Sequence, residues 1–190
     1  MNRFARRIDV GFEASTHAIE AMRAGYGDLD RSSIFKVDIN DIDPRIQPFL
    51  TGLGLSVFHT EVFYTSPGRF TQIHVDGPGP NDRCKLNWAY GAPGCQMKWY
   101  RDRPGSTGPL LKKTAIGTSY MAYDADQCEQ VFSAEIGLPS LVQAGTPHNI
   151  HNDTDEGRWC LSVVPGHTGN RSGFVTWEQG ERIFSPFFAD

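Results

Sequence analysis

The sequence predicts a mainly β protein, an antiparallel double-sheet jelly roll or barrel with one or two helices near its N-terminus. About eight short runs rich in β-branched and aromatic residues follow one another between residues 55 and 164. Clusters of Gly, Pro, Asn and Asp separate these runs, and strands do not alternate with helices as they do in a parallel sheet. This pattern is typical of two packed antiparallel sheets.

The composition is that of one folded domain. Of the 190 residues, 39% are hydrophobic and 21% are charged, which is too apolar for a disordered chain. The formal net charge of −4 gives no electrostatic footprint for a nucleic-acid backbone or an anionic membrane. No apolar run reaches the roughly 18 residues of a membrane span. We therefore expect a soluble, cytoplasmic protein that binds neither nucleic acid nor membrane, of undetermined oligomeric state.

We expect a single domain over residues 1–190, made of an N-terminal helical extension, a jelly-roll core and a C-terminal hairpin extension. These parts span residues 1–54, 55–164 and 165–190.

Two segments of the N-terminal extension indicate helices. Residues 12–24 place several alanines near one helical face. The sequence Asp43-Pro44, followed by residues 45–50 and Gly52, is a stronger signal, because Asp suits the N-cap, Pro the first helical position and Gly the end.

The remaining elements are predicted strands separated by loops. They span residues 55–64, 70–75, 84–90, 96–101, 118–123, 129–136, 140–143 and 158–164, with a closing hairpin formed by 174–177 and 182–184. The loops 77–82 and 101–114 are rich in Gly and Pro, and we expect them to border a binding site and to set its substrate selectivity.

The four cysteines form no C-x-x-C pair, so the sequence has neither a zinc knuckle nor a thioredoxin-type redox motif. Cys84 and Cys95 lie on adjacent predicted strands and could be bridged. Free, partly buried thiols are the expected state in a cytoplasmic chain.

His74 and Asp76 are the most informative pair of residues. Side chains two apart on a strand share one face, and Gly77-Pro78-Gly79-Pro80 ends the strand directly after them. Both side chains can therefore reach the mouth of a barrel and bind one metal ion. Two histidines and one carboxylate, with open positions opposite, are typical of non-haem Fe(II) oxygenases.

His148 is the preferred third ligand, and His151 is the alternative. His148 follows a predicted strand, and Arg158 comes ten residues after it at the start of an apolar strand. A guanidinium at such a position is costly to bury unless it meets an anion, and its planar fork matches a carboxylate. An exposed Arg158 paired with Asp155 or Glu156 is the other interpretation.

The order His74-x-Asp76, then His148, then Arg158 on a β-rich background resembles the Fe(II)- and 2-oxoglutarate-dependent dioxygenases. The resemblance covers roughly residues 55–164. It implies a double-stranded β-helix, the cupin-like form of the jelly roll. It also implies that the first three residues bind iron and that Arg158 pairs with the distal carboxylate of 2-oxoglutarate. The implied enzyme uses O2 to hydroxylate an unactivated C–H bond of a small molecule or a protein side chain, releasing succinate and CO2.

Three further residues are candidates for contact with 2-oxoglutarate. Lys85 and Asn87 alternate with Leu86 and Trp88, so one face of that strand is polar. Family members similar to the aspartyl/asparaginyl hydroxylases bind the cosubstrate from the corresponding strand. Ser162 shares its strand face with Arg158. The alternative for Lys85 is a solvated side chain.

The other polar and aromatic motifs are interpreted as structural. His59-Thr60-Glu61 resembles the His-x-Asp pair, but no second set of partners follows it, so we expect the polar face of an edge strand. Trp99-Tyr100 is expected in the core.

Two other function classes remain compatible with these residues. A cupin-like enzyme could use the same metal ligands without 2-oxoglutarate, with Arg158 holding the carboxylate of the substrate itself. A non-enzymatic β-barrel binding protein would have His74 and Asp76 near each other only by chance.

Overall fold

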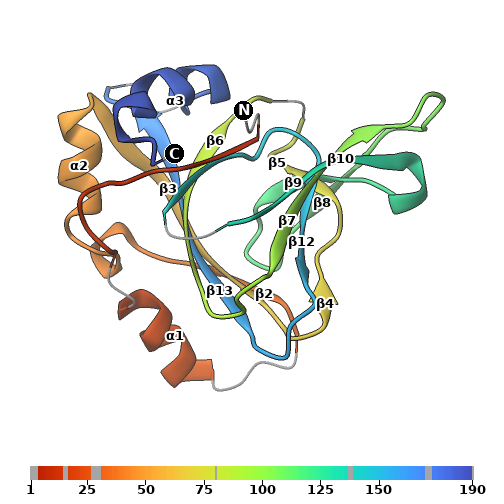
Figure 1. Cartoon of the computed structure of the whole chain (residues 1–190), viewed down its shortest axis with the longest axis horizontal. Helices are drawn as coiled ribbons and strands as arrows, with labels where there is room; N and C mark the ends of the chain where they lie inside the picture. The colour runs from red at the N-terminus through yellow and green to blue at the C-terminus, as the bar shows by residue number, and fades with distance from the viewer. Residues whose placement is uncertain are drawn as a thin grey trace.

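The computed structural model describes residues 4–14, 17–26, 31–79, 81–136, 139–169 and 173–189. Within these ranges the chain forms two antiparallel sheets with a cavity between them, and the helices lie on the outer side of the first sheet (Figure 1). The fold is a mainly β double-stranded β-helix of the jelly-roll type, as the sequence predicts.

The first sheet has the strand order β1-β11-β6-β13-β3-β2 in the described part of the chain. Its strands are β1 (Ala5–Arg7), β11 (Ser140–Gln143), β6 (Cys84–Tyr90), β13 (Arg158–His167), β3 (Leu55–Thr65) and β2 (Ser33–Lys36). The sequence predicts the four inner strands. It misses β1 and β2, which belong to the expected helical extension, because three or four residues are too few to show a period of two.

The second sheet has the order β10-β7-β12-β5-β9-β8, with β4 paired to β12. Its strands are β10 (Cys128–Glu135), β7 (Gln96–Asp102), β12 (His148–Asn152), β5 (His74–Asp76), β9 (Ser119–Ala122), β8 (Leu110–Lys113) and β4 (Arg69–Phe70).

Strands β8 and β12 correct the sequence prediction. The expected loop 101–114 contains β8, whose four side chains are all exposed, so it shows no alternation of buried and exposed residues. The polar sequence of β12 also carries no strand signal. A side chain anchors the end of this strand to neighbouring segments, because the Asn152 amide donates to the carbonyls of Thr65, Ser66 and Glu156.

The first sheet has one apolar face and one polar face, and this division positions the site. On β6, Leu86 and Trp88 are almost completely buried in the core cluster that includes the helices. Lys85 and Asn87 alternate with them and line the cavity. The prediction of a polar inner face is confirmed, and the alternative of a solvated Lys85 is wrong.

The helices cover the apolar face of the first sheet. They are α1 (His17–Tyr26), α2 (Ile46–Gly52) and α3 (Trp177–Phe184), with short 3-10 turns at Ile39–Asp41, Ala125–Gln127 and Ser185–Phe187. Helices α1 and α2 correspond to the two predicted N-terminal helices, although α1 begins later, at His17. Arg45 rather than Asp43 is the N-cap of α2, and Asp43 Oδ1 accepts a hydrogen bond from the Arg45 N–H.

Helix α3 replaces the predicted C-terminal hairpin, which is wrong. Thr176 and Gln179 form a capping box, in which each side chain accepts a hydrogen bond from the backbone N–H of the other. Trp177 and Phe184 are buried on one helical face. Residues 182–184 therefore belong to the last turn of an amphipathic helix, and the first predicted strand, 174–177, mostly precedes that helix.

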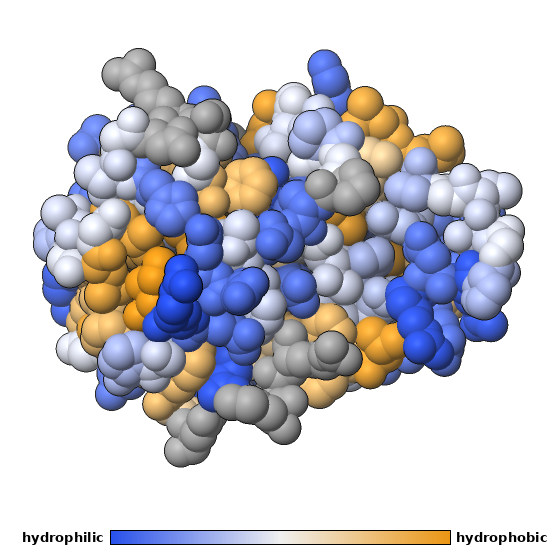
Figure 2. All heavy atoms as spheres, turned by 90° about the horizontal axis from the view of Figure 1, so that it is seen from above, coloured by the Kyte–Doolittle hydropathy of each residue, from blue (hydrophilic) through white to orange (hydrophobic). Residues whose placement is uncertain are grey.

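The surface has mixed polarity. On the face seen in Figure 2, hydrophobic residues form separate groups between hydrophilic ones. Among the described helices, none is long and apolar enough to cross a membrane.

A close contact between α3 and β6 gives a test of this packing. A Cβ atom at Gly180 would lie 2.8 Å from Cys84 Sγ, and Cys84 is a free, buried thiol, like Cys95, Cys128 and Cys160. Gly180→Ala should lower the free energy of unfolding by about 1–3 kcal/mol, although Ala normally stabilises a helix interior.

The matched background is Cys84→Ala, which removes the sulfur atom. In the Cys84→Ala background, Gly180→Ala should lower the free energy of unfolding by about 1 kcal/mol less than it does in wild type. Urea unfolding of the four proteins of a double-mutant cycle measures this difference. Equal costs in the two backgrounds would contradict the contact.

Candidate metal centre

Two neighbouring strands of the second sheet bring together two imidazoles and one carboxylate. His74 and Asp76 lie on β5 and share a face, and β12 places His148 directly opposite His74. One donor atom from each residue lies within 4.8 Å of the others, and the two imidazole centroids are 4.5 Å apart. These residues are the three ligands that the sequence predicts.

Backbone carbonyls orient both imidazoles. The Nδ1–H of His74 donates to the carbonyl of Gln72 at 2.8 Å, and that of His148 donates to Thr146, also at 2.8 Å. Each bond fixes the tautomer and leaves the Nε2 lone pair available for a metal.

The protonation states also suit a metal. Burial, assisted by the charge of His74, lowers the pKa of His148 to about 3, so this imidazole is neutral at neutral pH. Burial favours the neutral form of Asp76. The charge of the Lys85 ammonium is the largest opposing effect, and it helps to hold the pKa of the carboxyl well below its usual range. A neutral imidazole and an ionised carboxylate are the states that bind metal.

His151 does not join this group. It lies an odd number of residues from His148 on β12, so its side chain points to the other face. Its Nδ1 is 3.2 Å from Lys98 Nζ, and its ring stacks on Phe70 at 5.3 Å. Strand parity therefore places the two histidines on opposite faces of the sheet. The pairing of His148 with His74 makes His148 the third member of the cluster.

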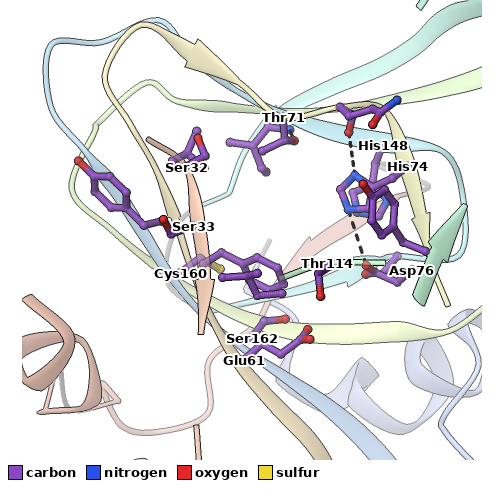
Figure 3. Close-up of a pocket in the computed structure, with 18 of the residues that line it drawn as sticks. Ser32, Ser33, Glu61, Thr71, His74, Asp76, Thr114, His148, Cys160 and Ser162 are labelled. Atoms are coloured by element: carbon purple, nitrogen blue, oxygen red, sulfur yellow. Dashed lines mark hydrogen bonds and ion pairs between the residues drawn. The ribbon is translucent and has the colours of Figure 1, made fainter. Parts of the chain in front are cut away.

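A cavity of about 760 Å³ lies between the sheets beside the three ligands. In Figure 3, His74, Asp76 and His148 lie together at one end of this cavity, while Ser32 and Ser33 lie toward the other. The wall includes every side chain proposed from the sequence: His74, Asp76, Lys85, Asn87, His148, Arg158 and Ser162.

The cavity wall differs from the expectation in its loops. Of the segment 101–114 only Thr114 lines the cavity, and none of the described residues of 77–82 does. Residues 31–35 and 114–120 contribute instead. The first of these enters the wall because β2 pairs with β3, a long-range contact that no local pattern shows.

Arg158 is buried without a full set of partners. Its side chain lines the cavity, it is 3% exposed, and its Nη2 has no hydrogen-bond partner among the described residues. Ser162 Oγ, on the same face of β13, and Asn87 Oδ1 are also buried without a partner there. A buried guanidinium without an anion is costly, so this wall fits a negatively charged ligand.

Glu61 is a site residue that the sequence analysis interpreted incorrectly. β3 is not an edge strand, because it lies between β13 and β2, and Glu61 is buried and faces the cavity. Its Oε2 is 3.3 Å from Lys85 Nζ, its Oε1 accepts a hydrogen bond from Thr118, and His59 Nε2 lies 3.1 Å from Oε1. The sequence feature that could have indicated this position is the charge of Glu61 within the otherwise mostly apolar predicted strand 55–64.

Comparisons with known proteins give only distant similarities. No protein-family model and no curated protein matches the sequence. Among solved structures, the chain resembles HygX from Streptomyces hygroscopicus, which has nickel and 2-oxoglutarate bound. The identity is 10% and the TM-score 0.41, over 80% of this chain and 76% of HygX.

Two other structures are also similar. Peruvianin-I, a cysteine peptidase from Thevetia peruviana latex, is 14% identical with a TM-score of 0.34, over 72% of this chain and 64% of its own. Bacillus subtilis oxalate decarboxylase is 12% identical with a TM-score of 0.32, over 72% of this chain and 26% of its own. Similarity this low carries no argument about activity, which has to come from the site itself.

The ligand set makes a direct prediction for metal binding. The wild-type protein should bind one Mn²⁺ in isothermal titration calorimetry. His148→Ala should weaken binding by more than about 100-fold, beyond the range of second-shell substitutions, because it removes a ligand atom.

His151→Ala is the matched control, since this histidine lies on the same strand but outside the cluster. It should leave the affinity within about 2-fold of wild type, well short of a ligand loss. A large loss in the control with none in His148→Ala would refute the ligand assignment.

Proposed function

We propose that the protein is an Fe(II)- and 2-oxoglutarate-dependent dioxygenase that hydroxylates an unactivated C–H bond of a small molecule or a protein side chain. The observation that carries the proposal is one cavity that holds both a two-histidine, one-carboxylate cluster and a buried Arg158 whose Nη2 has no partner in the described part of the chain. The first feature suits ferrous iron, and the second suits a carboxylate.

The residues present fit iron as the resident metal. His74, Asp76 and His148 would hold it from the second sheet, leaving its other positions open toward the cavity. The bound iron would supply the activation of O2 by which 2-oxoglutarate is converted to succinate and CO2 and the substrate is hydroxylated.

The first sheet would bind the organic acid. Arg158 would pair with the distal carboxylate of 2-oxoglutarate, because a bidentate guanidinium–carboxylate pair satisfies the open Nη2 and fixes the orientation of the acid. Ser162 and Asn87, which also line the wall, would offer hydrogen bonds nearby. We assign Lys85 to Asp76 and Glu61, with which its ammonium pairs, rather than to the cosubstrate.

The cavity itself would shape the reaction. Its volume is in the range of small-molecule sites, and Arg158 and His148 in its wall are almost completely shielded from bulk solvent. Exclusion of water strengthens the charge interactions on which orientation depends.

Succinate release is the direct test of this function. The protein incubated with Fe(II), O2 and 2-oxoglutarate should form succinate and CO2 in equal amounts, and a true substrate should accelerate the reaction. Mn²⁺ binding without succinate formation would favour the cupin-like enzyme that uses no 2-oxoglutarate, and absence of metal binding would favour a non-enzymatic protein.

Arg158→Met tests the proposed carboxylate contact. It should raise the KM for 2-oxoglutarate roughly 10- to 100-fold, the value of a lost charged hydrogen bond, without weakening Mn²⁺ binding. The free energy of unfolding should stay equal or rise, because an unpaired buried cation is removed.

Arg101→Met is the control, since this exposed arginine pairs with Glu129 on the surface. It should leave KM unchanged. An Arg158→Met enzyme with wild-type KM would show that the carboxylate binds elsewhere.

A further inference from the structure

Three buried charges connect the two sheets beside the metal ligands. Asp76 comes from β5 of the second sheet, whereas Lys85 and Glu61 come from β6 and β3 of the first. Lys85 Nζ lies 2.9 Å from Asp76 Oδ2 and 3.3 Å from Glu61 Oε2. The Lys85 side chain is 5% exposed and that of Glu61 is 4% exposed, so the contact between them is shielded from water, whereas the Asp76 side chain is 17% exposed toward the cavity.

The two oxygens of Asp76 have different surroundings. Oδ2 faces the Lys85 ammonium, whereas Oδ1 is 3.6 Å from His74 Nε2, the nitrogen left free for a metal. A charge-assisted hydrogen bond of 2.9 Å holds one oxygen firmly. Oδ1 remains beside His74 Nε2.

Glu61 keeps Lys85 in this position. Its other oxygen, Oε1, accepts a hydrogen bond from Thr118 Oγ1 at 3.2 Å and lies 3.1 Å from His59 Nε2. Burial opposes the charge on Lys85, but Asp76 and Glu61 outweigh burial and raise the pKa of the ammonium. The ammonium that contacts Asp76 is therefore also held on its other side by the Glu61 carboxylate.

We propose that Lys85 is a positioning residue that binds Asp76 Oδ2, so that Asp76 presents a single oxygen to the metal and leaves an adjacent coordination position for a ligand. Glu61 is the counter-ion that holds Lys85 in place. This role rests on the metal-binding part of the proposed function and does not require 2-oxoglutarate. In this role Lys85 contacts Asp76, one of the three residues proposed to bind the metal, rather than the cosubstrate.

Electrostatics and positioning predict opposite orders of affinity for two variants. Glu61→Gln removes a negative charge but keeps an amide oxygen that accepts a hydrogen bond from Lys85, so that Lys85 stays on Asp76. The double variant Lys85→Met/Glu61→Gln has the same net charge as wild type and no donor on Asp76. A purely electrostatic role predicts that the double variant binds a cation more tightly than Glu61→Gln, because a nearby positive charge is removed. Positioning predicts weaker binding.

The experiment is Mn²⁺ titration calorimetry on wild type and both variants, with thermal unfolding of the metal-free proteins as a check on folding. We expect the double variant to bind Mn²⁺ roughly 10- to 100-fold more weakly than Glu61→Gln, the range found for second-shell groups. Equal or tighter binding by the double variant would overturn the proposal.

A second measurement needs no variant and covers the case in which the double variant does not fold. In a crystal structure of the wild-type protein with Mn²⁺, Asp76 should bind the ion through Oδ1 alone, with Oδ2 still on Lys85. Two bound oxygens would overturn the proposal. A wild-type protein without Mn²⁺ affinity would overturn both this role and the proposed function, whereas Mn²⁺ binding without succinate formation would overturn only the function.

Discussion

The ion pairs of Lys85 with Asp76 and Glu61 are the constraint on which the site depends. The charged groups of Lys85 and Glu61 are buried between the two sheets, and that of Asp76 is mostly buried. A buried charge is tolerated only when partners compensate it. Lys85 supplies that compensation to both carboxylates at once. The pairing also joins the sheets, because it connects β6 and β3 to β5. The positions of the metal ligands and the relation of the two sheets are therefore not independent.

The need to compensate buried charges also explains why helices cover the first sheet. Because its inner face carries Glu61, Lys85, Asn87, Arg158 and Ser162, the sheet cannot bury that face in a hydrophobic core. Its apolar residues point outward and would meet water without cover. Helices α1, α2 and α3 supply that cover (Figure 1). The N-terminal and C-terminal helices therefore stabilise the first sheet on the face opposite the cavity.

The sequence predicted those elements whose side chains alternate clearly. Strands β6 and β13 are long, and their polar and apolar residues separate onto two faces, so local periodicity is sufficient. Strand β8 has no such pattern because all its side chains are exposed. Strand β12 has none because its sequence is almost entirely polar, although the strand is buried in part. Helix α3 stands where a hairpin over 174–177 and 182–184 is predicted, because a capping box of Thr176 and Gln179 starts a helix there.

The sequence by itself determined the chemical types and order of the site: His74 and Asp76 on one strand, a later histidine, and an arginine at the start of an apolar strand. Those follow from residue identity and from the period of a strand. Only the tertiary structure decided that His148 rather than His151 completes the cluster, that Arg158 Nη2 has no partner among the described residues, and that Lys85 pairs with both Asp76 and Glu61. Each of these depends on strand register and on the packing of one sheet against another, which are contacts between residues far apart in the chain that local patterns do not encode.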